Sequence, residues 1–479
     1  MKKTHNDTKK RLVIIVILFL LFSFVAKLLY LYFLPLPLSY DEAYYWDWSR
    51  FLDFGYYNKP PMVAWIIRAF TEVFGNTEFA VRLPALICVT LTIFLSFFLV
   101  WKYFSEVNAT WLLLNLFFIP ALTVYSFIMT IDPPLILFWI LSLLFFLNYL
   151  KKPCYKNAIF AGIFVGLGLL TKQTMFAFVF LSGIYLLLFN RNLLFKKETF
   201  FLFLTAFLIY FPNLYWNYNH QFVLLKHTEE HFTRKTLSIY SFLKFLGDSI
   251  GVYTPLFLFF LYSGIAYARK FFKNQYSEAL KFLYFLSFPS ILSLLFLSFF
   301  IELNANWILP FVLTGFLFLF GYISLSSGWR VFLFGNLVIA ITLSVMVYLL
   351  GYFPQRFPEP LQVLLEKFRG WKILAERVER YYNQNIPLVT ENRAIAATLA
   401  FYMKSHPKVY VIQFKKYPEN QYHLWRNADS LTGKRVLVVK KGLKKPYYLE
   451  NSEKISEIEA KVTSKRHRYF SIWEGTLNL

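Results

Sequence analysis

The sequence predicts an α-helical membrane protein that crosses the bilayer many times and ends in a small α/β domain. Three observations predict this fold class. Of the 479 residues, 57% are hydrophobic and 16% are charged, which is too apolar for an ordinary soluble domain. Apolar runs long enough to span a membrane recur between residues 12 and 351. After residue 351, short helix-like and strand-like runs alternate instead.

The apolar runs predict about eleven transmembrane helices. They lie at residues 12–34, 79–101, 109–129, 133–150, 157–170, 174–190, 199–215, 249–268, 280–301, 307–326 and 331–351. The first run follows a basic N-terminus and lacks a small-residue cleavage site, so we interpret it as an uncleaved helix rather than a signal peptide. The short runs 157–170 and 174–190 are also compatible with bent or tilted segments.

The distribution of charge predicts the orientation of these helices. If the basic N-terminus is cytoplasmic, every loop on the cytoplasmic side is short and basic, as the positive-inside rule requires. The opposite loops are the long or acidic ones, chiefly 35–78 and 213–248. An odd number of spans then places the C-terminal region in the periplasm. We expect a multi-pass protein of the bacterial inner (plasma) membrane.

The alternation after residue 351 predicts a second domain. We assign residues 1–351 to a transmembrane domain with large external loops, and residues 352–479 to a periplasmic α/β domain. Helices are expected at 371–382 and 394–403, and strands at 387–390, 409–414 and 435–439.

The balance of charges and the cysteines narrow the classes of partner. The formal net charge is +23, which in a membrane protein favours anionic lipid and an acidic substrate over nucleic acid. Cys88 lies within an apolar run and Cys154 in a short loop, so no disulfide framework and no cysteine-based metal motif is expected.

One stretch between the first two apolar runs contains most of the candidate functional residues. It reads SYDEAYYWDWSRFLDFGYYNKPPMVAW from Ser39 to Trp65. Two adjacent carboxylates, Asp41 and Glu42, precede a dense group of aromatic residues and an Asn-Lys-Pro-Pro motif. Charges at a membrane boundary are costly unless they are used or neutralised, so this loop is a candidate functional site.

The predicted topology gathers further polar residues on the same outer side of the membrane. A transporter or proton pump would more often place ionisable groups near the middle of the bilayer. Here the groups favour a site that works at the outer leaflet. Carboxylates together with cations suit a phosphate-linked donor, because cations hold the leaving phosphate and a carboxylate takes a proton from an incoming hydroxyl. The further residues are Lys59, Arg82, Asp132, Lys172, His231, Arg234 and Asn306.

The chain resembles the GT-C glycosyltransferases that use polyprenyl-phosphate sugars. This superfamily includes the protein O-mannosyltransferases, the lipid A aminoarabinose transferases and the lipopolysaccharide core galacturonosyltransferases. The tail segments GWKILAERV, LAFY and NQYHLW resemble the galacturonosyltransferase branch in particular. The resemblance covers essentially the whole chain and implies a GT-C-like fold. Its motifs are the first loop, AVRLPAL with Arg82, the loop with Asp132, LLTKQT with Lys172, EHFTR with His231 and Arg234, and ELNANWILP with Asn306.

The residues and the resemblance together suggest roles at the site. Asp41 is the candidate catalytic carboxylate, as a general base or by orienting the acceptor, against the alternative of a helix cap. Glu42 is the second candidate, and supporting the site or facing water remains open for it. Lys59, Arg82, Lys172, His231 and Arg234 are expected to bind the donor phosphate. A snorkelling lysine or an interface anchor is the alternative for Lys59 and Arg82.

The remaining candidates are assigned to substrate binding, and we assign no metal ligand. Asp132 precedes two prolines, so a role at a helix N-terminus is its alternative. Residues 213–248 are expected to close over the donor as a lid, and a solvated loop with incidental charges is the alternative. A divalent cation held by Asp41, Asp132 and nearby groups is left open, because the spacing contains no recognised ligand motif. The candidates for substrate binding are Tyr44, Tyr45, Asn58, Asp132 and Asn306.

One position departs from the related enzymes. The aminoarabinose transferases and some mannosyltransferases resemble one another in a glutamate before the Lys-Pro-Pro, where this chain has Asn58. A carboxylate that could hold a metal or shape the sugar pocket is therefore absent at this position. We do not expect the sugar specificity of those enzymes to carry over directly.

The expected function is transfer of a sugar from polyprenyl phosphate to lipid A or the lipopolysaccharide core at the periplasmic face, with inversion. Galacturonic acid is the preferred sugar because of the tail segments. Transfer of aminoarabinose or another sugar is the first alternative, and protein O-mannosylation is the second. A lipid transporter or flippase is the alternative that is not an enzyme.

Overall fold

A computed structural model describes residues 2–230, 237–271, 276–426 and 428–479. Within these ranges the chain divides into two units by its internal contacts. The first unit contains the residues up to Tyr32 together with Arg82–Val347, and the second contains Phe33–Val81 and Tyr348–Leu479. The predicted candidates His231 and Arg234 lie outside the described residues.

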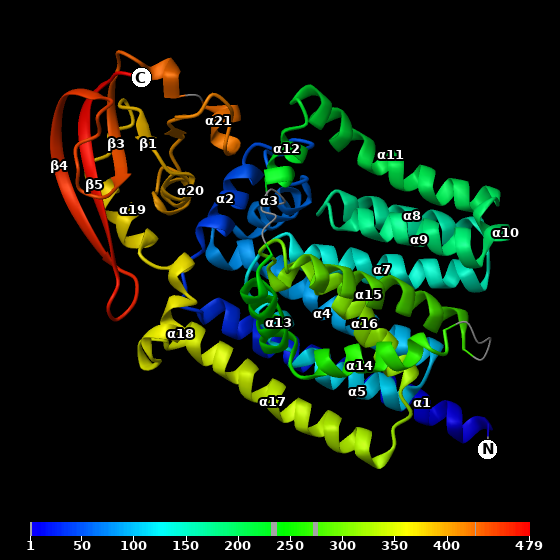
Figure 1. Cartoon of the computed structure of the whole chain (residues 1–479). Helices are drawn as coiled ribbons and strands as arrows, with labels where there is room; N and C mark the ends of the chain where they lie inside the picture. Colours follow the sequence, from blue (N-terminus) through cyan, green and yellow to red (C-terminus); the bar gives the residue numbers. More distant parts are fainter. Residues whose placement is uncertain (1, 231–236, 272–275, 427) are drawn as a thin grey trace. The chain divides into compact units, whose positions relative to one another are not determined.

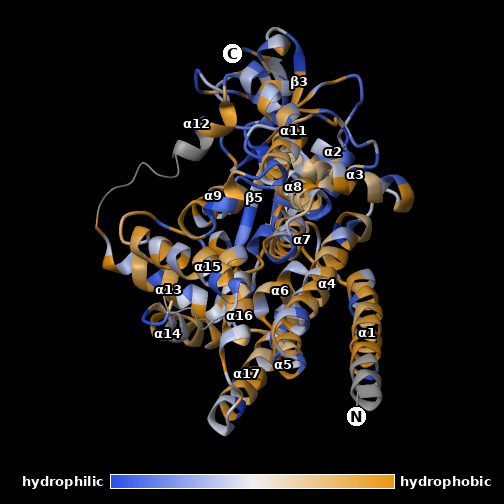
Figure 2. Cartoon of the chain, turned by 90° about the vertical axis from the view of Figure 1, so that its right-hand side faces the viewer, coloured by the Kyte–Doolittle hydropathy of each residue, from blue (hydrophilic) through white to orange (hydrophobic). Residues whose placement is uncertain are grey.

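The first unit is built from helices (Figure 1). Figure 2 shows that α1, α4 and α17 are hydrophobic along most of their length, as helices in contact with lipid would be. The helices are α1 (Lys2–Phe33), α4 (Glu78–Tyr103), α5 (Glu106–Phe117), α6 (Pro120–Tyr125), α7 (Asp132–Lys151), α8 (Tyr155–Leu169), α9 (Met175–Phe189), α10 (Arg191–Leu194), α11 (Lys197–Asn219), α12 (Val223–Glu230), α13 (Ile239–Tyr253), α14 (Leu256–Ala268), α15 (Glu278–Leu297), η1 (Ala305–Ile308), α16 (Leu309–Tyr322) and α17 (Ser327–Tyr352).

Seven helices in the described residues are long and apolar enough to cross a membrane, which confirms a multi-pass membrane protein. The count becomes eight if α13 and α14, which meet at a bend of 108°, form one broken span. This is fewer than the eleven predicted. Helices α8 and α9 are apolar but have only 15 residues each. The predicted span 109–129 is wrong as a single helix, because α5 ends before Phe118 and Pro120 begins α6.

Close packing of α8 against α11 depends on small residues. A Cβ atom added to Gly166 would lie 2.7 Å from the Cβ of Ile209, which is closer than real side chains approach. A Cβ at Gly162 would collide with the backbone carbonyl oxygen of Leu202. Glycine therefore lets the two helices approach closely, as small residues do in membrane helix pairs.

The second unit combines the segment after α1 with the C-terminal region. Its sheet is mixed, with the strand order β2-β1-β3-β5-β4. Strand β1 runs parallel to β2 and β3, whereas β5 is antiparallel to both β3 and β4. The elements are α2 (Tyr40–Ser49), α3 (Met62–Phe74), η2 (Pro354–Arg356), α18 (Glu359–Val363), η3 (Glu366–Phe368), α19 (Trp371–Glu379), β1 (Leu388–Thr390), α20 (Arg393–Tyr402), β2 (Val409–Val411), α21 (Gln421–Trp425), η4 (Ala428–Leu431), β3 (Arg435–Lys441), β4 (Leu449–Lys461) and β5 (His467–Leu477).

The predicted mixture of helices and strands in the C-terminal region is confirmed. The two predicted helices are α19 and α20, and the three predicted strands are β1, β2 and β3. The long hairpin of β4 and β5 was not predicted, because β4 is mostly exposed and rich in charge. The division into domains 1–351 and 352–479 stays a prediction.

The first loop packs against the C-terminal region within the second unit. The backbone N–H of Leu38 donates to the Tyr402 hydroxyl at 2.6 Å, and this hydroxyl donates to Glu78 Oε1 at 2.8 Å. The ring of Trp46 meets Phe401 edge-on, with 4.9 Å between centroids. Helix α2, which carries the two adjacent carboxylates, is therefore supported by helix α20.

Candidate functional site

Helix α2 begins with a complete capping box. The Ser39 hydroxyl oxygen accepts from the Glu42 backbone N–H at 3.2 Å, and the Ser39 N–H donates to Glu42 Oε2 at 2.9 Å. The Ser39 hydroxyl also donates to Oε2 at 3.0 Å. The cap satisfies backbone donors that a helix start would otherwise leave unpaired. Glu42 is fully buried, so it does not face water, and its carboxylate closes the capping box; a catalytic role for it stays a prediction.

Asp41 differs from its neighbour in exposure and in partner. Its side chain is 28% exposed, and Oδ1 accepts from Arg393 Nη2 at 3.1 Å. Arg393 opens helix α20, and its guanidinium lies over the rings of Tyr40 and Tyr44 at 5.6 and 5.0 Å. Asp41 is therefore both accessible and oriented by a cation, which suits a carboxylate that handles a substrate.

Tyr44 and Tyr45, both predicted to bind substrate, are buried. The Tyr44 hydroxyl accepts from the Gln421 backbone N–H at 2.6 Å, and its ring packs against Trp48 and Tyr422. Burial raises the pKa of the Tyr44 hydroxyl well above its usual range, so the group stays neutral. Tyr45 packs against Trp48 with 5.0 Å between centroids. Tyr44 therefore joins α2 to α21, whereas the contact between Tyr45 and Trp48 lies within α2.

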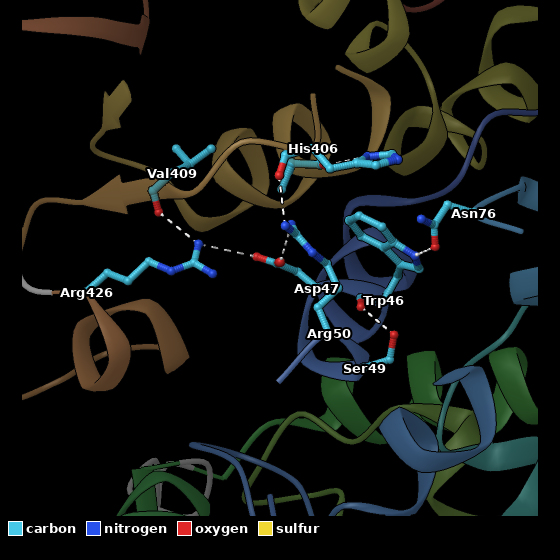
Figure 3. Close-up of polar contacts among 9 residues, drawn as sticks. Trp46, Asp47, Ser49, Arg50, Asn76, His406, Val409 and Arg426 are labelled. Atoms are coloured by element: carbon cyan, nitrogen blue, oxygen red, sulfur yellow. Dashed lines mark hydrogen bonds and ion pairs between the residues drawn. The ribbon is translucent and has the colours of Figure 1, made fainter. Parts of the chain in front are cut away.

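Sequence reasoning missed a buried charged group at the C-terminal end of α2. Asp47 is fully buried, and Figure 3 shows it between Arg50 and Arg426. Its Oδ1 lies 3.0 Å from Arg50 Nη1, and its Oδ2 lies 3.8 Å from Arg426 Nη1. The two arginines also donate to the backbone carbonyls of His406 and Val409. No local pattern links Asp47 to Arg426, because only folding brings them together.

Asn58 and Lys59 lie at a tight turn. The backbone N–H of Tyr56 donates to the Lys59 carbonyl at 3.1 Å, which closes the turn. The ring of Tyr56 stacks on Trp48 with 4.5 Å between centroids and an angle of 10°. In the part of the chain that the structure describes, Asn58 Oδ1 is buried without a hydrogen-bond partner. The turn thus holds Asn58 and Lys59 at a defined place after α2.

The first unit brings three predicted residues together around one carboxylate. Asp132, at the start of α7, is 3% exposed. Its Oδ1 accepts from Lys172 Nζ at 2.8 Å, and its Oδ2 accepts from Asn306 Nδ2 at 3.3 Å. The Tyr125 hydroxyl also donates to Oδ2 at 3.2 Å. Tyr125 is a further member of the site that the sequence did not reveal. We call these four residues the Asp132 cluster.

The remaining candidates are placed as follows. Arg82 lies near the start of α4 with its side chain 1% exposed. Among the described residues, no group of three or more His, Cys, Asp or Glu side chains has a geometry that could hold a metal ion. The first unit contains Arg82, Asp132, Lys172 and Asn306, and the second contains Asp41, Glu42, Tyr44, Tyr45, Asn58 and Lys59.

Comparisons of the sequence with known proteins give three matches. Residues 58–216 match the family described as dolichyl-phosphate-mannose-protein mannosyltransferase. The lipid A galacturonosyltransferase RgtD of Rhizobium johnstonii is 25% identical over 395 residues, covering 80% of this chain and 81% of RgtD. The undecaprenyl phosphate-alpha-4-amino-4-deoxy-L-arabinose arabinosyl transferase 1 of Proteus mirabilis is 32% identical over 135 residues, covering 26% of this chain and 24% of that protein.

The fold is similar to that of a solved structure along nearly its whole length. ArnT from Cupriavidus metallidurans, in the apo state, has a TM-score of 0.65 at 15% identity, covering 95% of this chain and 97% of ArnT. The same protein bound to undecaprenyl phosphate has a TM-score of 0.63 at 16% identity, covering 94% and 97%. The sequence matches and the shared fold confirm the resemblance that the sequence motifs predicted.

Proposed function

We propose that this chain, a membrane glycosyltransferase of the GT-C class, transfers galacturonic acid from a polyprenyl phosphate to lipid A or the lipopolysaccharide core. The reaction takes place at the periplasmic face of the inner membrane. The anomeric centre inverts, because a single displacement of the lipid phosphate brings the acceptor in from the opposite side.

The observation that carries the proposal is the Asp132 cluster. Lys172 is buried beside Asp132 in a unit made largely of apolar helices. A buried ion pair in such a unit is costly and is usually retained for function. An ammonium has three N–H donors, so its bond to Asp132 leaves donors that can reach a phosphate. A phosphate that arrives on a lipid tail suits this place.

The structure of ArnT with undecaprenyl phosphate supports this choice of donor, because the two folds match along nearly the whole chain. In our proposal Lys172, with Lys59, Arg82, His231 and Arg234, binds the donor phosphate and stabilises its charge as it leaves. Electrostatic stabilisation of a leaving group is commonly the largest contribution to catalysis.

In our proposal Asp41 acts on the acceptor, whereas the cations act on the donor phosphate. If the acceptor is a sugar hydroxyl, Asp41 takes its proton or orients it. If the acceptor is a lipid A phosphate, which is already ionised, Asp41 positions groups and no strong base is needed. Its partial exposure and its bond to Arg393 support either role, whereas Glu42 is occupied by the helix cap.

The choice of sugar and acceptor is supported by RgtD, which is named a lipid A galacturonosyltransferase and matches four-fifths of this chain. The net charge of +23 also suits an acidic sugar and a phosphorylated lipid. Aminoarabinose is the second candidate, favoured by the higher identity of 32% to the arabinosyl transferase over 135 residues. Asn58, which replaces the glutamate expected in those enzymes, argues against it.

Mass spectrometry of lipid A and core oligosaccharide tests the proposal. Samples come from cells with the gene, without it, and with an Asp41→Asn version. We expect a hexuronic acid increment that is present with the gene and disappears in the other two strains. A pentosamine increment instead would select the second candidate. An unchanged lipopolysaccharide profile across the three strains would overturn the proposal.

A further inference from the structure

A polar cavity of about 360 Å³ lies within the second unit. Its walls come from the starts of α2, α19, α20 and β5, and from the end of β3. We call it the basic cavity, because Arg393, Lys441 and Arg468 line it. We propose that the basic cavity binds the anionic group of a substrate: the carboxylate of a uronic acid or the phosphate of a lipid headgroup.

Two of the three cations are held in place by their surroundings. The Arg468 guanidinium lies 4.3 Å from the centre of the Trp371 ring and donates to the backbone carbonyls of Arg369 and Glu366 at 3.0 and 2.9 Å. Arg393 is fixed by Asp41 and by the rings of Tyr40 and Tyr44. A planar guanidinium that is already oriented can bind a carboxylate or phosphate with little loss of entropy.

The acidic residues of the wall are already paired. Glu391 Oε1 accepts from the Tyr448 hydroxyl at 2.6 Å and lies 3.2 Å from Lys440 Nζ. Glu366 Oε1 lies 3.6 Å from Arg468 Nη2. Neither carboxylate therefore needs a cation from solution, and the cavity does not suit a positively charged ligand.

Lys441 is the cation of the basic cavity that neither of these carboxylates pairs with. Its side chain forms no ion pair in the part of the chain that the structure describes, and it is exposed at the cavity. The exposed Lys441 ammonium lies on a flexible side chain, so it can donate to an anion that the two arginines already hold in place. The volume lies in the range of small-ligand sites, roughly 300–1,000 Å³.

The basic cavity lies beside Asp41, the candidate catalytic carboxylate. Arg393 lines the cavity and also donates to Asp41, so the cavity and the candidate catalytic carboxylate share one side chain. Tyr40, next to Asp41, contributes to the wall. Rings of Tyr40, Trp371 and Phe470 surround the charged groups, a composition typical of small-ligand pockets. Recognition of a substrate here rests on the proposed function; binding of an anion does not.

Binding to the full-length protein in lipid nanodiscs tests the inference. The first pair of probes is D-galacturonate and D-galactose, which differ in the carboxylate. The second pair is lipid A with and without its phosphates. The variant Lys441→Gln removes the exposed cation, and Lys434→Gln, just before the other end of β3, is the matched control. Melting temperatures are measured to check that both variants remain folded.

We expect Lys441→Gln to weaken binding of an anionic probe about tenfold, the loss typical of one charge-assisted hydrogen bond. Lys434→Gln should bind like the wild type, and neutral probes should not distinguish the proteins. A loss confined to galacturonate assigns the cavity to the donor sugar. A loss confined to phosphorylated lipid A assigns it to the acceptor.

Two results would overturn the inference: no binding of either anionic probe to the wild type, or equal binding to the wild type and Lys441→Gln. These results concern binding alone, so they are distinguishable from a failure of the proposed transfer reaction in cells. Galacturonate transfer could persist in a protein that binds no anion at this cavity, and the reverse also holds.

Discussion

Arg393 donates from Nη2 to Asp41 Oδ1 at 3.1 Å, although the two residues are 352 positions apart in the chain. The carboxylate belongs to the first loop, and the guanidinium belongs to the first turn of α20 in the C-terminal region. A bond of this kind fixes the direction in which a carboxylate presents its second oxygen. The C-terminal region therefore takes part in shaping the candidate active site.

The first prediction concerns Arg393→Lys. An ammonium keeps the charge but lacks the planar fork, so Asp41 loses its fixed orientation. We expect the transfer rate to fall roughly tenfold to a hundredfold. The free energy of unfolding should change by less than about 1 kcal/mol, because both side chains are partly exposed. Kinetics and thermal unfolding measure the two effects. Arg435→Lys, in an exposed pair, is the control, and equal activity of the two variants would refute a positioning role.

The second prediction separates the adjacent carboxylates. Asp41→Asn should lower the transfer rate at least about a hundredfold, if Asp41 is the base. Glu42→Gln should keep most activity, because an amide oxygen can still accept from the Ser39 donors. Glu42→Ala should lower the free energy of unfolding by about 1 kcal/mol through loss of the cap. Rates and unfolding curves of the three variants test this, and an inactive but stable Glu42→Gln would reverse the assignment.

The third prediction concerns the buried pair in the first unit. Lys172→Met leaves Asp132 without its cation, and we expect a loss of about 3–5 kcal/mol in the free energy of unfolding. The double variant Lys172→Met, Asp132→Asn removes both charges and should recover most of this loss. It should stay inactive if Lys172 binds the donor phosphate. Unfolding in detergent and a transfer assay test both statements, and an active double variant would show that the pair is structural only.

The fourth prediction concerns Asp47, which the sequence did not single out. Asp47→Ala leaves the buried guanidinium of Arg426 without its carboxylate, so we expect a loss of about 3–5 kcal/mol in stability. Glu457→Ala, in an exposed pair with Lys454, should cost less than about 1 kcal/mol. Chemical denaturation of the two variants gives the comparison. Similar losses would mean that Arg426 is satisfied by its backbone partner alone.

The fifth prediction concerns pH and His423. Burial lowers the pKa of this imidazole, so the folded protein binds the proton less readily than the unfolded chain. The neutral ring accepts from the Glu419 backbone N–H at 3.0 Å, a bond that protonation would break. Its contribution to stability is therefore present above a pH of about 6.5 and falls as the pH drops below that value. Melting temperatures of the wild type and His423→Gln are compared at about pH 7.5 and pH 5. The wild type should lose more of its melting temperature between these pH values than the variant. An equal loss in both proteins would contradict the prediction.

Local patterns in the sequence determined the class of the protein. A span is recognised from about twenty neighbouring apolar residues, so the runs that became α1, α4, α7 and α17 could be identified without a structure. Asp41, Asp132 and Lys172 are candidates from the sequence alone, because charge beside an apolar run is costly without a use. The break between α5 and α6 at Pro120 and the bend between α13 and α14 lie inside or beside apolar runs, so hydropathy alone did not locate them.

Only the tertiary structure decided which charged groups meet. Lys172 and Asn306 both donate hydrogen bonds to the Asp132 carboxylate. Arg393, in a helix far along the chain, donates to Asp41. The tertiary structure also distinguishes Asp41 from its neighbour Glu42. Glu42 is buried in the capping box, while Asp41 remains accessible. The physical reason is that an ion pair depends on distances of a few ångströms between side chains. Folding sets those distances between residues whose separation along the chain carries no information about them.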